Sequence, residues 1–169
     1  MPHPTPSLGE QLLHHWQRVA GLPLGKRLFS WMVGRKAPYT QTVGGVFADL
    51  RPGFARVELR DRRAIRNHLS SIHAVAMVNV AEMTSGVALM TALPTGVRGI
   101  VTSLAIVYHK KARGTLTCTT TTQAPNDVVA PMPFDVVADI TDSAGDLVAR
   151  ATVQWTLSPT PAKILQPTS

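Results

Sequence analysis

One continuous apolar segment constrains this chain more than any other feature. Residues Ala74 to Leu93 read AVAMVNVAEMTSGVALMTAL, and Glu82 is the only ionisable side chain among them. A helix built from this segment is apolar on nearly every face, so the rest of the chain must wrap it. A carboxylate in such surroundings is costly to bury, because desolvation disfavours its charged form. We therefore look for function around Glu82.

The same segment is long enough to cross a bilayer, so a membrane span is the first alternative. Its apolar residues are mostly Ala, Val and Met. An acidic residue near the middle of a membrane helix costs about 2.5–3.5 kcal/mol on insertion scales. The remaining chain reads as strands that can cover a helix. We therefore predict a buried core helix and no membrane partner.

Two short helices and six strands are expected around this helix. Helical spacing of apolar residues predicts a helix from Ser7 to Ala20, with Ser7 as N-cap, and a second between Leu24 and Met32. From Thr40 the apolar period becomes two, which predicts strands at 40–50, 54–60, 98–109, 115–123, 134–141 and 147–157. Short turns between successive strands favour an antiparallel sheet. The expected fold class is α+β, with this sheet curled around the central helix, which is the hotdog fold.

The chain length of 169 residues fits one domain with a substantial core. Within it we expect an N-terminal helical extension at 1–38, the hotdog domain at 39–158 and a C-terminal tail at 159–169.

The charge of the chain favours anionic partners. Lys and Arg total 17 against 10 for Asp and Glu, a formal charge of +7. Nucleic acid, anionic lipid and phosphorylated small molecules all fit this balance. No helix-turn-helix signature is evident and only 5% of residues are aromatic, so we predict no nucleic-acid partner. Cys118 is the only cysteine and the N-terminus lacks the pattern of a secretory signal, which together favour a cytoplasmic location.

Three polar residues have a spacing that points to a known family. Asn67 stands six residues before His73, and Glu82 stands nine residues after it. This pattern resembles the hotdog acyl-CoA thioesterases of the phenylacetate-pathway and hydroxybenzoyl-CoA type. The N-terminal helices resemble those of an uncharacterised thioesterase-like branch of that superfamily.

The resemblance implies hydrolysis of an acyl-CoA thioester. In it Glu82 is the general base or the nucleophile, Asn67 holds water or a carbonyl, and His73 orients the loop or the thioester. Backbone N–H groups of Ala74 and Val75 would polarise the carbonyl at the helix start. The family commonly has two glycines at these two positions, so the side chains here restrict the approach of the thioester.

The helix pattern and the resemblance to the thioesterases predict further contacts around Glu82 and the substrate. Asn79 shares a face with Glu82 and could hydrogen-bond its carboxylate, and Thr102 is a second candidate polar contact to the substrate. The CoA phosphates would meet basic residues, for which the candidates are Arg98, Lys110, Lys111 and Arg113. The resemblance also implies a homodimer or homotetramer with shared sites. We expect no metal and no cofactor beyond the coenzyme A of the substrate.

Other functions remain open from the sequence. His68 stands fourteen residues before Glu82, a spacing similar to that of hotdog hydroxyacyl dehydratases, although the Pro-Gly that precedes their helix is missing. A non-catalytic acyl-CoA-binding module is the third possibility, because the glycines are replaced. Glu82 itself could be a structural carboxylate with a partner, and His73 a hydrogen-bonded structural residue.

Overall fold

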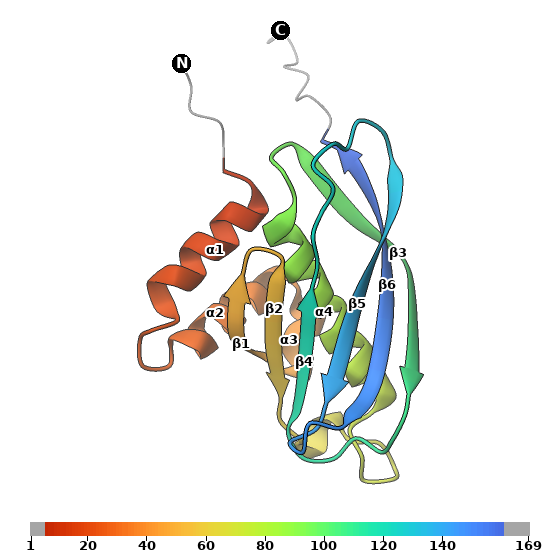
Figure 1. Ribbon diagram of the computed structural model, residues 1–169. Helices are drawn as coiled ribbons and strands as arrows, with labels where there is room; N and C mark the ends of the chain where they lie inside the picture. The colour runs from red at the N-terminus through yellow and green to blue at the C-terminus, as the bar shows by residue number, and fades with distance from the viewer. Residues whose placement is uncertain (1–5, 161–169) are drawn as a thin grey trace, which may run out of the picture.

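The computed structural model describes residues 6–160, which form three N-terminal helices, one sheet and a long central helix (Figure 1). The first helix, α1, spans Leu8–Val19. Its start is fixed by a capping box: the Glu10 N–H donates to Ser7 Oγ (3.1 Å), and the Ser7 N–H donates to Glu10 Oε2 (2.6 Å). The prediction of Ser7 as N-cap is confirmed. The second helix, α2, spans Gly25–Lys36.

A third helix, α3, spans Pro38–Val43, where the sequence had predicted the start of a strand. That prediction is wrong for residues 40–43. Pro38 occupies the first turn, where its missing N–H is tolerated, and Gly44 ends the helix in a left-handed conformation with φ 75°. Thr40 and Val43, three residues apart, are both buried on the side that packs on the central helix. The expected boundary between 38 and 39 would cut α3.

Six antiparallel strands form a single sheet in the order β1-β2-β4-β5-β6-β3. Their bounds are Val46–Arg51 (β1), Phe54–Leu59 (β2), Val97–Tyr108 (β3), Leu116–Thr121 (β4), Met132–Thr141 (β5) and Leu147–Pro159 (β6). A short 3-10 turn, η1, at Arg63–Ile65 follows β2. All six predicted strands exist. The predicted C-terminal tail begins at the last residue of β6, and residues 161–169 lie outside the described part.

The central helix α4 spans Ala74–Ala92, and the sheet curls around it as predicted (Figure 1). Apart from Glu82, its middle is buried and built largely from small residues, including Ala81, Ser85 and Ala88. Small side chains let the neighbouring elements approach closely. A Cβ on Gly86, for example, would lie 3.0 Å from the Trp155 ring of β6. The hotdog architecture is therefore confirmed.

The helices α1 and α3 cover much of the part of α4 that the sheet leaves free. Trp16 of α1, Phe29 of α2 and Phe47 of β1 form a chain of edge-to-face aromatic contacts, with ring centroids 5.2 and 5.3 Å apart. By length and composition α4 could also span a bilayer, but 61% of its most apolar window is buried inside the molecule. It is a core helix.

The helix α2 also closes one edge of the sheet. Ser30 Oγ accepts from the Phe47 N–H of β1 (2.9 Å), and Lys26 Nζ donates to the Ala48 carbonyl (2.8 Å). These contacts use backbone groups that an edge strand otherwise exposes to another chain. At the other edge β3 pairs with β6 alone, and no strand of the described chain covers its outer side.

We expect Gly9→Ala to loosen α1 from the core. Gly9 lies directly against α4, and a Cβ there would overlap the backbone carbonyl of Met90. Backbone cannot yield as a flexible side chain does, so the substitution should lower the free energy of unfolding by about 1–3 kcal/mol. Thermal unfolding measures the loss. Gly21→Ala is the control, because a Cβ on Gly21 meets nothing within 4 Å. Equal melting temperatures for the two variants would contradict the close contact.

Candidate active site

The first half of α4 has one side that the chain does not cover. Val75 is 49% exposed, and Val78 and Glu82 are partly exposed, whereas most of the helix is buried. Spacings of three and four residues place these side chains on one face. This strip, Val75, Val78 and Glu82, begins at the helix N-terminus and ends at the carboxylate.

Glu82 is the only acidic side chain of α4 and lacks a partner of its own. Within residues 6–160 no hydrogen bond or ion pair to its carboxylate is formed, and Ser85 Oγ bonds to the Glu82 backbone carbonyl instead (3.0 Å). Burial raises the pKa of the Glu82 carboxyl above its ordinary value of 4.5. When ionised, such a group is a stronger base than an ordinary surface carboxylate.

The helix start is organised by His73, which is the N-cap of α4. The Val75 N–H donates to His73 Nδ1 (3.2 Å), so this ring nitrogen carries no proton in the capped state. The His73 backbone is held in turn, because its N–H donates to the Ile65 carbonyl (2.8 Å). The imidazole therefore positions the first turn of the helix, and one of the two N–H groups expected to face a thioester is already used.

The Ala74 N–H is the other expected donor, and no residue in the described part of the chain accepts from it. It belongs to the first turn, whose N–H groups have no partner inside the helix. The Ala74 carbonyl accepts from the Tyr108 hydroxyl (3.2 Å), which fixes the end of β3 against the helix start. Sequence reasoning missed Tyr108 as a site residue; its position as the last residue of the strand was the available signal.

A pocket of about 520 Å³ lies beside this helix start. It is bordered by three elements, α3, η1 and the first turn of α4, and includes His73 and Val75. The other residues that line it are Tyr39, Thr42, Val43, Ala64, Ile65, Arg66 and Ala76.

Asn67 organises the turn that leads into the helix. Its Oδ1 accepts from the N–H groups of Leu69 (2.9 Å) and Ser71 (3.2 Å), and its own N–H donates to the Ser71 carbonyl (2.8 Å). The Oδ1 is therefore committed to the turn, and Nδ2 is the group left to hold water or a carbonyl. His68 lies exposed in the same turn.

Two predicted contacts are not formed. Asn79 is buried and turned toward α3, where its Nδ2 donates to Thr40 Oγ1 (3.1 Å), so the predicted bond to the Glu82 carboxylate is wrong. Thr102 is exposed at a bulge between Val101 and Ser103, and its hydroxyl donates to the Gln154 carbonyl (3.3 Å). It therefore gives no polar contact toward the helix.

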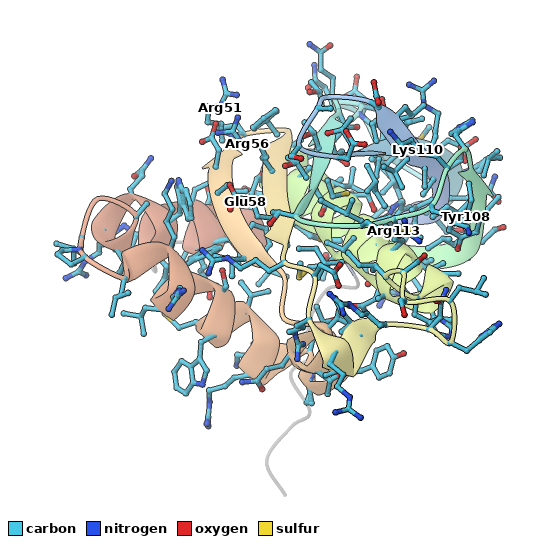
Figure 2. All side chains as sticks on the ribbon, turned by 90° about the horizontal axis from the view of Figure 1, so that it is seen from below. Arg51, Arg56, Glu58, Tyr108, Lys110 and Arg113 are labelled. Atoms are coloured by element: carbon cyan, nitrogen blue, oxygen red, sulfur yellow. The ribbon has the colours of Figure 1, made fainter. Side chains whose placement is uncertain are left out.

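The four predicted phosphate ligands fall into different surroundings. Lys110 is held between Asp142 (2.6 Å) and Asp146 (2.7 Å), which leaves it little freedom to bind phosphate. Lys111 and Arg113 are exposed in the loop after β3, and that loop is tied to the helix start because Ile72 N–H donates to the Ala112 carbonyl (2.9 Å). Figure 2 shows Tyr108, Lys110 and Arg113 near one another. Arg98 is at the opposite end of β3 and donates to Ser158 Oγ (3.3 Å).

The family of the chain follows from comparison with known proteins. The family described as a domain of unknown function, DUF4442, matches residues 25–157, from the first residue of α2 into the last strand, β6. The chain belongs to the DUF4442 family. No curated protein matches it.

Solved structures share the fold of this DUF4442 protein. The genomics target APC5556 is 28% identical with a TM-score of 0.77, over 91% of this chain and 100% of that one. A Pseudomonas aeruginosa protein of unknown function, described as a probable thioesterase, is 20% identical with a TM-score of 0.70 over 82% and 97%. A phenylacetic acid degradation-related protein from Ralstonia eutropha JMP134 is 17% identical with a TM-score of 0.60 over 70% and 89%. These likenesses confirm the predicted hotdog fold.

We expect Glu82→Gln to raise the melting temperature at neutral pH. Since burial raises the pKa of Glu82, the folded chain keeps this proton to a higher pH than the unfolded chain does. The stability that this group gives is complete below the unfolded pKa and is lost as pH rises through the folded pKa. Gln has the same size and no charge to bury. The gain should be present at about pH 8 and vanish near pH 4, where both side chains are neutral.

Thermal unfolding of the wild-type protein and of Glu82→Gln at both pH values tests this prediction. A lower melting temperature for Glu82→Gln at the higher pH would mean that the carboxylate has a stabilising partner, as in a structural ion pair.

Proposed function

We propose that this protein hydrolyses acyl-CoA thioesters, with Glu82 as the catalytic carboxylate. The observation that carries the proposal is the uncovered strip of α4: a partnerless carboxylate with a raised pKa lies on the same face as a helix N-terminus that has a free N–H. A base and an oxyanion donor are the two elements that acyl transfer to water requires.

Hydrolysis follows two possible routes from this carboxylate. As a general base, ionised Glu82 takes a proton from water while the water oxygen attacks the thioester carbonyl carbon. The oxyanion then collapses, the C–S bond breaks, and the thiolate leaves with the proton from the glutamic acid. As a nucleophile, Glu82 attacks the carbon directly, the C–S bond breaks and the coenzyme A thiolate leaves. Water then cleaves the resulting anhydride, which releases the acid and frees the Glu82 carboxylate. Both routes need the ionised carboxylate, so activity should be lost as pH falls through its raised pKa.

The helix start supplies the oxyanion site in this proposal. The Ala74 N–H and the partial positive charge of the α4 N-terminus stabilise the developing negative charge on the carbonyl oxygen. His73 acts as a positioning residue, because its ring caps Val75 and fixes the direction of the first turn. The side chain of Val75 narrows the approach and favours some acyl groups over others.

We place the two elements of each site in different subunits. Ala74 and Glu82 are separated by eight residues of α4, or about 12 Å along its axis, whereas a reacting atom must lie about 3 Å from its base or nucleophile and from its oxyanion donors. The uncovered edge of β3 offers the contact, with Ile100 and Val107 more than half exposed. A homodimer paired along β3, or a tetramer made from two such dimers, would combine Ala74 of one subunit with Glu82 of the other in each site.

The same pairing arranges the basic residues. Antiparallel pairing of β3 about a two-fold axis brings the start of one strand beside the end of the other. Arg98 of one subunit would then join Lys111 and Arg113 of its partner around the coenzyme A phosphates, while Lys110 keeps its aspartates. We also propose a cytoplasmic location, which the single buried thiol of Cys118 fits.

Two other functions are distinguished by one set of assays. A hotdog hydratase would use His68 with Glu82, and an acyl-CoA-binding module would use neither. Thiol release from a panel of acyl-CoAs, run beside hydration of an enoyl-CoA, separates the three. Thiol release supports the proposal. Hydration without thiol release, or binding without turnover, overturns it.

Glu82→Gln and Ala74→Pro should each lower thiol release by about 10²-fold or more, through the base and the oxyanion donor respectively. Proline fits at position 74, because His73 is extended (φ −64°, ψ 140°) and the first helical position tolerates a missing N–H. Ala74→Pro should therefore fold normally. Mixed dimers of the two variants should regain about half of the wild-type turnover, because one of their two sites is intact.

The mixed dimers are made by co-expression with two affinity tags, and each homodimer is the control. Failure of the mixture to regain activity, with both variants folded, would place base and donor in the same chain. A Glu82→Gln protein with wild-type turnover would remove the proposed mechanism itself.

Reversing the charges of Lys111 and Arg113 to Glu should raise KM for acyl-CoA about tenfold or more and leave kcat nearly unchanged. Contacts that hold only the nucleotide bind ground state and transition state alike. KM for a short thioester without the nucleotide should not change. The difference should shrink at high salt, since the Debye length is only about 8 Å at physiological ionic strength.

Arg56→Glu on β2 is the matched reversal, away from the end of β3 (Figure 2). An equal rise in KM for both substrates would indicate general damage to the site, and no rise for either would show that these two residues are an ordinary solvated loop.

A further inference from the structure

The tip of the N-terminal helices carries a group of exposed apolar side chains. We call Leu22, Leu24, Leu28 and Trp31 the Leu–Trp face. Their exposed fractions are 59%, 71%, 47% and 48%. Positions 24, 28 and 31 follow helical spacing and lie on the outer side of α2, and Leu22 is in the turn just before it. Single exposed leucines are common, but four large apolar residues within ten positions form a patch.

Leu24 is held in a backbone conformation that does not suit leucine. It has φ 60° and ψ 5°, in the left-handed region, and it is the N-cap of α2 without a side-chain capping bond. Glycine or asparagine would be favoured at such a position. Its side chain is also the most exposed of the four. Neither the local conformation nor packing within the chain accounts for leucine here, which points to a use outside the chain.

The helices that carry the Leu–Trp face are strongly basic. Between positions 6 and 37 the chain has five basic residues and one acidic residue, so the balance is 5 − 1 = +4 with histidines neutral. All five basic side chains are exposed: Arg18, Lys26, Arg27, Arg35 and Lys36. The Arg35 guanidinium lies over the Trp31 ring, 5.2 Å from its centroid. Leucine and tryptophan on one side of a helix with Lys and Arg along its flanks is the composition of helices that lie in the surface of a membrane.

Charge also argues against a second copy of the chain as the occupant. A two-fold contact places the same patch on both sides, and would bring these five basic residues against their own copies. An anionic lipid surface attracts them instead, with each Lys or Arg near the surface adding to the binding.

We propose that the Leu–Trp face docks this protein on the surface of an anionic lipid bilayer. Leu22, Leu24 and Leu28 enter the boundary between head groups and acyl chains, Trp31 lies at head-group level, and Arg27 and Arg35, which lie beside Trp31, meet the lipid phosphates. This differs from the expectation of no membrane partner, which rested on the burial of the central helix. The basic residues lie mainly on α2. The docking does not depend on which reaction the protein catalyses, and α4 stays in the core.

The test is co-sedimentation of the full chain with vesicles. The protein should bind vesicles in which about a third of the lipid is phosphatidylglycerol, and should bind pure phosphatidylcholine about tenfold less. High salt should release it. Trp31 provides a direct probe, because Trp16 and Trp155 are buried at 8% and 5% exposure. Its fluorescence should shift to the blue on binding and be quenched by brominated lipid, and Trp31→Phe should lose both signals.

Substitutions separate docking from folding. Leu22→Ser, Leu24→Ser and Leu28→Ser together should weaken vesicle binding about tenfold or more. Leu24→Asn should weaken it while keeping or raising the melting temperature, because asparagine suits both the left-handed conformation and the N-cap. Val129→Ser is the control, since Val129 is 89% exposed elsewhere and should leave binding unchanged.

Absence of wild-type binding to the anionic vesicles, or equal binding by the triple variant, would overturn the proposal. A smaller oligomer for the triple variant in sedimentation would do the same, since it would show that another copy of the chain covers the face.

Discussion

The burial of α4 is the constraint on which the rest of the structure depends. A helix with apolar residues on every side cannot lie on a surface, so the chain must surround it. The curled sheet covers most of it, and α1 and α3 cover much of what remains. The N-terminal helices are thus part of the core and not an appendage: Trp16 and Phe29 are as buried as strand residues, and α2 closes the edge at β1 with Ser30 and Lys26.

The one gap in this cover is also the place of the one carboxylate. Val75, Val78 and Glu82 stay partly exposed because neither sheet nor helices reach them. Burying a lone carboxylate completely would be costly, whereas a gap lets it stay partly hydrated with a raised pKa. The gap limits the destabilisation from Glu82, and in the proposed function it would also leave room for a substrate and for a second subunit. Candidate function and incomplete packing coincide for this physical reason.

Local patterns were predictable from the sequence, and long-range contacts were not. The apolar run placed the start of α4 at Ala74, and Ser7 as N-cap placed the start of α1. Asn79 illustrates the limit. Helical spacing predicted that it lies on the same face as Glu82, but its hydrogen-bond partner Thr40 belongs to α3, which the sequence pattern had assigned to a strand. Thr102 lies at a bulge in β3, and the aspartates that hold Lys110 come from the turn between β5 and β6. Both features depend on how the strands pair in the folded sheet. The spacing of Asn67, His73 and Glu82 pointed to the hotdog fold because it is local in sequence.

The two surfaces left without partners lie at opposite ends of the sheet. The order β1-β2-β4-β5-β6-β3 puts the uncovered edge at β3, while α2 and its Leu–Trp face lie beyond β1 (Figure 1). The two edges differ. Side chains of α2 hydrogen-bond to backbone groups at the outer edge of β1, and nothing in the described chain pairs with the outer edge of β3. Pairing along β3 would therefore leave both copies of α2 free at the far ends of the dimer. In these two proposals assembly and membrane docking would use separate surfaces, and neither would block the strip on α4.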